Sequence, residues 1–254
     1  MEQAEKHLKI GLYESSLSTE AAAYVRYFSH LLGSPPHLLP QNRGTNGELR
    51  TASNDDLDNL DLLLYWEAKR EWWQRVLRIY PVFRTLNRTV SSVLVVRQIR
   101  WPLRRILLIL RADESDEAAI QWLRRLACPA RATVFILPIV PPVPAMYRHG
   151  SLPLHTDITL ATHTSSGARM RRLISLCATW NIQGELLLHN SEPQRRMEWA
   201  ITTSNCDLII ISDEPERWVL RQFFGELTRP LLHRANRPIL IAKNTETHAN
   251  RLFT

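Results

Sequence analysis

Residues 105–126 read RILLILRADESDEAAIQWLRRL, and this stretch decides the fold class. Ile106–Leu110 is a short run of apolar residues, which is typical of a strand buried on both faces. Asp113–Ser115 supplies side chains that cap helices, and apolar residues recur at helical spacing from Ala118 to Leu126. The stretch therefore predicts a strand, a turn and a helix in succession.

The same alternation continues along the rest of the chain. Strands are predicted over 133–140, 185–189, 207–211 and 238–242, and helices over 170–180, 193–202 and 218–233. The proline-rich stretch 141–153 predicts a loop. Strands that alternate with helices favour a parallel sheet covered on both faces, so this part of the chain is predicted to form a complete, doubly wound α/β unit.

The amino-terminal part repeats the two ends of this pattern and omits its middle. Strands are predicted over 9–13, 37–39, 62–65 and 93–96, and helices over 18–32 and 72–88. Residues 41–59 are polar and rich in turn formers, and they predict a long loop with a helical turn near Asp55. This part is therefore predicted to be a truncated unit, which lacks one strand and most of two helices.

A comparison without gaps supports a duplication. An offset of 146 residues places Asp61 over Asp207 and the strand 93–95 over 239–241. The same offset aligns Asn59 with Asn205, Trp72 with Trp218, Arg75 with Arg221, Leu86 with Leu232 and Arg88 with Arg234. We therefore predict an α/β fold of tandem doubly wound, Rossmann-like parallel-sheet units, with a truncated unit over 1–100, a complete unit over 101–244 and a tail over 245–254.

Composition narrows the functional classes. The 254 residues carry 32 Lys and Arg against 25 Asp and Glu, a formal net charge of +7, and no apolar run is long enough to span a bilayer. The first residues contain no secretory signal, and the three cysteines are odd in number and widely spaced, so a reduced cytoplasmic chain is expected. The nine histidines form no ligand-like pair, and no metal is expected. Arginine doublets leave a nucleic-acid partner open, although such doublets usually mark a solvated helix face.

The complete unit resembles the universal stress protein family over residues 103–243. The resemblance is carried by residues 105–115 (RILLILRADES), 132–142 (ATVFILPIVPP), 205–212 (NCDLIIIS) and 236–242 (NRPILIA). Residues 8–97 look like a shortened tandem copy of the same unit. The family's sheet order implies that this copy loses only an edge strand, so that its strands 2, 1, 4 and 5 stay contiguous.

The resemblance also implies where ATP would bind, and the complete copy departs from that pattern. ATP-binding members carry Gly, two residues, Gly, nine residues, Gly and then Ser or Thr after the fourth strand; these positions here hold Ser212, Pro215, Gly225 and Glu226. Proline offers no N–H donor, and Glu226 brings negative charge to the place of the phosphates. Arg111 stands where the family tends to place an Asp that bonds the ribose. The matching positions of the shortened copy are Glu14, Trp66, Lys69 and Ile79.

Two weaker features follow the same strand. The acidic residues Asp213, Glu214 and Glu216 could act as acids or bases, but acidic side chains ahead of a helix more often cap its first turn, and capping is the preferred interpretation. Thr228 and Arg229 could bind a small anion with the backbone of Gly225, because a turn into a helix offers free N–H groups. The simpler interpretation of Gly225 is a residual turn glycine.

We therefore expect a non-catalytic protein of the universal-stress type that binds no ATP or other cofactor and acts through protein–protein contacts in a stress response. The degenerate pocket comprises Arg111, Ser212, Gly225, Glu226 and Thr228. We expect the strands 93–96 and 239–242 to pair within the chain, and a protein partner or a homo-oligomer to form through these last strands, because bare strands expose hydrogen-bonding edges. Two alternatives stay open: a module that senses a nucleotide or anion near Arg111 and Gly225, and a polyanion-binding protein.

Overall fold

The computed structural model describes residues 8–13, 19–38, 42–43, 49–50, 60–66, 86, 89–110, 116–139, 165–189, 193–213 and 227–244. It divides the chain into two compact units, the first made of residues 1–101 and 238–254 and the second of residues 102–237. Several predicted features lie outside the described residues, namely most of the helix 72–88, the loop 141–153, the turn at Asp55 and the tail 245–254.

Four parallel strands are seen in the described residues of the second unit. These are β7 (Arg105–Leu110), β8 (Thr133–Pro138), β9 (Gly184–Leu186) and β10 (Leu208–Ser212). They lie in the order β10-β7-β8-β9, and Ile106 of β7 pairs with both Leu208 of β10 and Val134 of β8. Every residue of β10 and all but the first of β7 are buried, which explains their continuous apolar sequences.

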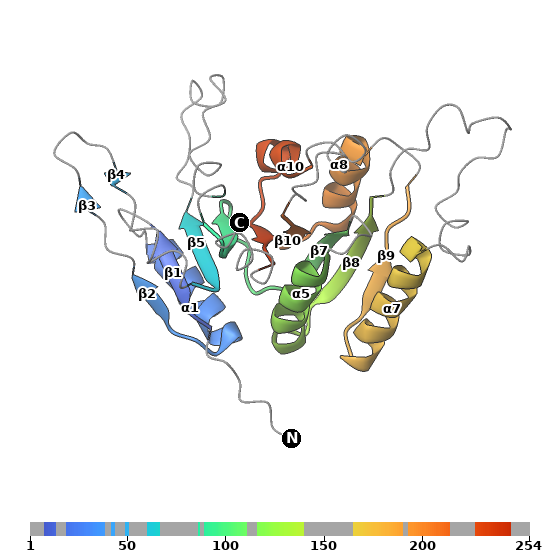
Figure 1. Ribbon diagram of the computed structural model, residues 1–254, viewed down its shortest axis with the longest axis horizontal. Helices are drawn as coiled ribbons and strands as arrows, with labels where there is room; N and C mark the ends of the chain where they lie inside the picture. Colours follow the sequence, from blue (N-terminus) through green and yellow to red (C-terminus); the bar gives the residue numbers. More distant parts are fainter. Residues whose placement is uncertain are drawn as a thin grey trace, which may run out of the picture. The chain divides into compact units, whose positions relative to one another are not determined.

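Four helices are seen in the described residues of the second unit. They are α5 (Asp116–Ala130), α7 (Ser165–Thr179), α8 (Pro193–Ser204) and α10 (Thr228–Arg234). Helices α5 and α7 lie on one face of the sheet and α8 on the other (Figure 1). Helix α5 buries Ala119, Trp122, Leu123 and Leu126 against the strands, which is the apolar stripe that its sequence predicts.

The first unit contains the truncated copy together with β11. Its strands are β1 (Ile10–Tyr13), β2 (Pro36–Leu38), β5 (Leu62–Trp66), β6 (Ser92–Val96) and β11 (Ile239–Ala242), with α1 (Thr19–Leu32) after β1. The first four strands are parallel in the order β2-β1-β5-β6, so the predicted contiguity of strands 2, 1, 4 and 5 is confirmed. The predicted loop 41–59 holds a short antiparallel pair, β3 (Asn42–Arg43) with β4 (Leu49–Arg50). The sequence could not predict this pair, because a strand of two residues is too short to show an alternating pattern.

The last strands of the two sequence copies pair with each other, as predicted. β11 runs antiparallel to β6, with Leu240 opposite Leu94, Ile239 opposite Val95 and Ile241 opposite Val93. Leu94 and Leu240 are equivalent under the offset of 146 residues, so the pairing is symmetric about them. This pairing places β11 in the first compact unit, although the sequence repeat assigns it to the second copy.

Two local devices recur in both copies. Asp207 Oδ2 accepts hydrogen bonds from the backbone N–H groups of Arg104 and Arg105, each at 2.9 Å, and Asp61 Oδ2 accepts one from Lys9 at 2.9 Å. Helices α1 and α5 end in the same hydrogen-bonding pattern, with Gly33 at φ 64° and Arg131 at φ 49°. The repeat thus extends from the sequence to the way each first strand begins and each first helix ends.

Candidate functional site

The carboxyl end of β10 is occupied by a side chain where the ATP-binding pattern needs a glycine. Ser212 is completely buried, and its Oγ donates a hydrogen bond to Oδ1 of Asp116 at 3.2 Å. Asp116 opens α5 and is itself only 4% exposed. A buried carboxylate therefore lies at the end of β10, close to the place where a phosphate would approach the backbone.

The other predicted pocket residues are only partly placed. Thr228 is buried at the first residue of α10, and the preceding residue, Leu227, makes no side-chain cap. Asp213 is half-buried directly after β10. The remaining members lie outside the described residues: Arg111, Gly225 and Glu226, as well as Pro215, Glu214 and Glu216. The structure thus joins Ser212 to a residue that sequence analysis did not select, Asp116.

In the truncated copy, Trp66 stands at the position equivalent to Ser212. It is the last residue of β5, pairs in register with Val96 of β6 and is half-buried. An indole at the end of this strand fills space that a phosphate and a bare backbone would need. The equivalent positions Glu14, Lys69 and Ile79 lie outside the described part of the chain.

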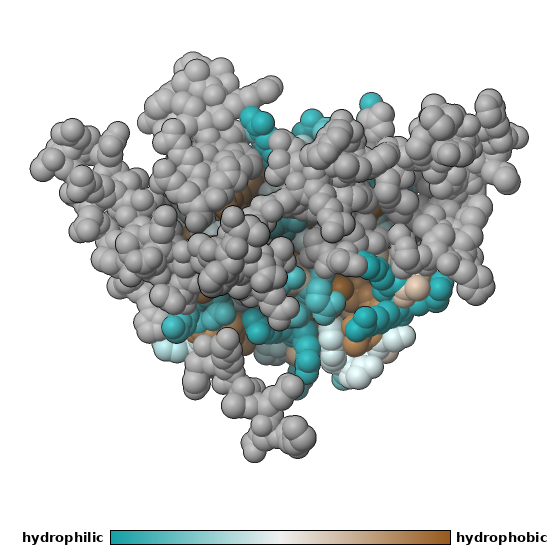
Figure 2. All heavy atoms as spheres, viewed as in Figure 1, coloured by the Kyte–Doolittle hydropathy of each residue, from teal (hydrophilic) through white to brown (hydrophobic). Residues whose placement is uncertain are grey.

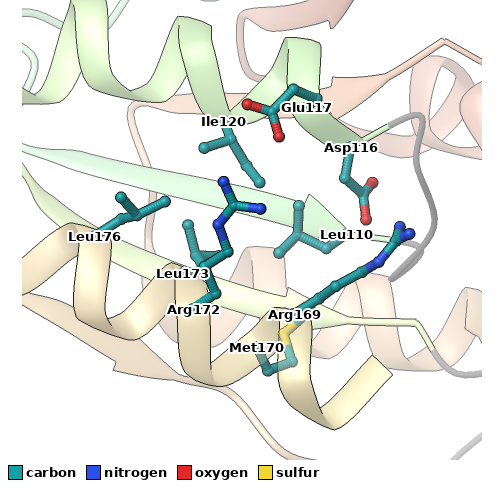
Figure 3. A pocket seen from close by; sticks show the side chains of 9 residues that line it. All are labelled: Leu110, Asp116, Glu117, Ile120, Arg169, Met170, Arg172, Leu173 and Leu176. Atoms are coloured by element: carbon teal, nitrogen blue, oxygen red, sulfur yellow. The ribbon is translucent and has the colours of Figure 1, made fainter. Parts of the chain in front are cut away.

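A second candidate site is a cavity of about 250 Å³ in the second unit, on the face that carries α5 and α7 (Figure 3). Apolar side chains form its wall: Leu110 from the end of β7, Ile120 from α5, and Met170, Leu173 and Leu176 from α7. Four charged residues complete the lining, Asp116 and Glu117 from α5 with Arg169 and Arg172 from α7. Hydrophobic surface bordered by hydrophilic surface is visible between these helices in Figure 2.

Each arginine of this cavity extends from α7 toward an acidic residue of α5 (Figure 3). The guanidinium of Arg169 extends toward the carboxylate of Asp116, while that of Arg172 reaches beside Ile120 toward Glu117 (Figure 3). Asp116 is buried, whereas Glu117 and Arg172 are exposed. Asp116 therefore serves both features: it accepts the hydrogen bond of Ser212 and lines the cavity.

The three cysteines have the properties of unreactive thiols. Burial raises the pKa of the Cys177 and Cys206 thiols, and it raises the pKa of Cys128 against the smaller opposing effect of Arg124. A raised pKa keeps these groups as neutral thiols near pH 7, which weakens them as nucleophiles. Among the described residues no group of three His, Cys, Asp or Glu side chains could hold a metal ion.

Comparison with solved structures identifies the fold. A universal stress protein from Pseudomonas aeruginosa UCBPP-PA14 superposes with a TM-score of 0.64 at 14% identity and covers 96% of this chain and 97% of its own. One from Archaeoglobus fulgidus DSM 4304 gives a TM-score of 0.62 at 8% identity, over 94% of this chain and 97% of its own. The chain has the universal stress protein fold.

A third match has no assigned function. A functionally unknown protein from Pseudomonas aeruginosa PAO1 gives a TM-score of 0.61 at 13% identity, over 96% of each chain. No protein-family model and no curated protein sequence matches the chain. The likeness to universal stress proteins is therefore one of fold, over both units, and the functional residues must be argued from this chain alone. No helix in the described ranges is long and apolar enough to cross a membrane.

The pairing of Ser212 with Asp116 could not be found from the sequence, because 96 residues separate them. In the universal stress protein fold the end of the fourth strand lies beside the start of the first helix, and β10 pairs directly with β7. The available signal was a polar residue at the first turn of α5 together with a serine ending an otherwise apolar strand. The contact between these two residues can be inferred only once the pairing of β10 with β7 is known.

Proposed function

We propose that this chain is a non-catalytic protein of the universal-stress type that acts in the cytoplasm through contacts with other proteins and does not bind ATP. One observation carries the second half of the proposal. The buried Ser212–Asp116 hydrogen bond fills the end of β10 and presents a carboxylate there. A phosphate group would have to displace this contact and to approach a negative charge in a poorly solvated place, which is unfavourable.

Contact with another protein is proposed because the chain keeps the scaffold while it departs from the ATP-binding pattern at Ser212, Pro215 and Glu226. Four of the five strand positions, the Asp61 and Asp207 hydrogen bonds and the end of the first helix recur in both copies. A homo-oligomer through the last strands stays a prediction, and it would have to accommodate the pairing that β6 and β11 already make with each other. A module that senses a nucleotide or anion near Arg111 and Gly225, and a polyanion-binding role, also stay predictions.

The experiment is a thermal melt of the full chain with and without millimolar Mg-ATP. A ligand that binds only the folded state stabilises it by about 2.7 kcal/mol at a hundredfold excess over its dissociation constant. We expect a change in Tm of less than about 1 °C, which corresponds to a few tenths of a kcal/mol for a chain of this size. A shift of several degrees would overturn the proposal.

The variant Asp116→Asn separates charge from shape. It keeps an oxygen that can accept the hydrogen bond of Ser212 and removes the negative charge. We expect this variant to stay unresponsive to Mg-ATP, because Pro215 and Glu226 still depart from the ATP-binding pattern. Binding by the variant and not by the wild type would show that the Asp116 charge alone is the barrier, and it would contradict the role given to Pro215 and Glu226.

A further inference from the structure

The cavity beside α5 and α7 combines apolar and charged lining residues that have no part in the proposed function. Its wall is apolar, and Asp116 is already engaged with Ser212 and faced by Arg169 (Figure 3). The guanidinium of Arg169 therefore lies beside a group of opposite charge. The chemistry available to a ligand therefore comes from the other two charged residues, Glu117 and Arg172.

Glu117 and Arg172 stand on different helices and face one another over the cavity. Glu117 lies in the first turn of α5 and Arg172 in the second turn of α7, and both are exposed. Figure 3 shows the carboxylate and the guanidinium pointing toward each other, with Ile120 and Leu173 close to the guanidinium. A ligand at this position meets one negative group, one positive group and an apolar wall.

We propose that this cavity binds a free amino acid with an apolar side chain. The ligand's carboxylate pairs with the guanidinium of Arg172, its ammonium group pairs with Glu117, and its side chain packs on Ile120, Leu173 and Leu176. A ligand with a single charge would leave one of the two protein charges unmatched, whereas a zwitterion satisfies both. Glu117 and Arg172, the two charged partners proposed for the ligand, take no part in the Ser212–Asp116 contact at the end of β10, so Mg-ATP binding and amino-acid binding can be measured independently.

The size of the cavity agrees with this ligand. Drug-sized ligands occupy pockets of roughly 300–1,000 Å³. A volume of about 250 Å³ falls just below that range and suits a molecule the size of one amino acid rather than a nucleotide. The apolar wall favours a branched or aliphatic side chain, because each buried methylene group strengthens binding about fourfold.

The first experiment titrates L-leucine into the full chain by calorimetry, with three analogues. L-Leucinamide lacks the carboxylate and N-acetyl-L-leucine lacks the ammonium charge, and we expect each to bind at least tenfold more weakly than L-leucine. Glycine lacks the side chain and is expected to bind about a hundredfold more weakly or worse. The proposal is overturned by the absence of heat at 10 mM L-leucine, or by equal affinity for L-leucine and either charge-deleted analogue. Equal binding of octanoate would also overturn it, since the site would then accept an amphiphilic anion.

The second experiment tests the two residues. Arg172→Gln and Glu117→Gln should each weaken L-leucine binding at least tenfold, and because both side chains are exposed the melting temperature without ligand should not change. Arg171→Gln is the matched control: Arg171 is the preceding, exposed residue of α7 and does not line the cavity. Unchanged leucine affinity in both Arg172→Gln and Glu117→Gln, or an equal loss in Arg171→Gln, would refute the assignment.

Discussion

Lys243 follows β11 and bonds it to the residues around β6 in the first unit. Its replacement by methionine should destabilise that unit strongly. Only 7% of Lys243 is exposed. Its ammonium group donates hydrogen bonds to the carbonyl oxygen of Thr89 at 2.7 Å and to that of Leu86, while its backbone N–H donates to Oγ of Ser92 at 3.0 Å. Methionine has a similar length and no donor, so Lys243→Met leaves two carbonyl groups without their partner.

The size of the effect follows from these two bonds. Each buried acceptor that loses its partner costs about 1–3 kcal/mol, and hydrogen bonds from a charged donor lie toward the upper end. The variant no longer has to bury an ammonium group, which offsets part of this cost. The net loss in the free energy of unfolding should be about 2–4 kcal/mol, or roughly 6–12 °C in Tm for a chain of this size.

The assay is a urea titration followed by circular dichroism, with Lys9→Met as the control. Lys9 is an exposed lysine at the start of β1 in the same unit, and its replacement should change the free energy of unfolding by no more than about 0.5 kcal/mol. If Lys243→Met also stays within about 0.5 kcal/mol of the wild type, the ammonium group does not hold β11 in place, and the argument from its two bonds fails.

Two further predictions concern the repeat. Arg131→Gly should raise the free energy of unfolding by about 1 kcal/mol, and Gly33→Ala should lower it by a similar amount, because both residues have positive φ values, which favour glycine over residues with a Cβ atom; urea titrations with the opposite signs would contradict this. A fragment of residues 1–97 lacks β11, the partner of β6, and should show no cooperative melt as a monomer by circular dichroism; a cooperative monomeric melt would show that the truncated copy folds without its partner strand.

The strands could be predicted from the sequence because each is a short apolar run with no competing periodicity. β7 and β10 fall within one residue of their predicted ends. Helix α7 begins at Ser165, five residues before the predicted start, since its first turn, Ser-Ser-Gly-Ala-Arg, has no apolar spacing to reveal it. In the described part of the chain, α10 begins only at Thr228.

The candidate sites were predicted less completely than the strands. Ser212 was selected from a family pattern, but its partner Asp116 depends on the contact between the end of β10 and the start of α5. Glu117 was not selected from the sequence, and Arg172 stood out only as part of an arginine doublet, because a charged residue on a helix is usually solvated. Their relation arises only when two helices, joined through a strand and a long intervening stretch, lie on the same face of the sheet.

The two ends of the parallel strands differ in what the fold requires of their residues. At the edge where the strands begin, an N–H group that opens β1 or β7 has no strand partner, so both copies keep an aspartate to accept it, Asp61 and Asp207. At the edge where the strands end, the equivalent positions are Trp66 and Ser212, which share no chemistry. The fold therefore needs an acceptor such as Asp61 or Asp207 where the first strand begins, whereas it sets no common requirement for the residue at positions 66 and 212. A departure from the phosphate-binding pattern at these positions therefore costs the fold little, which is why the proposals above assign other contacts to the carboxyl edge and to the face between α5 and α7.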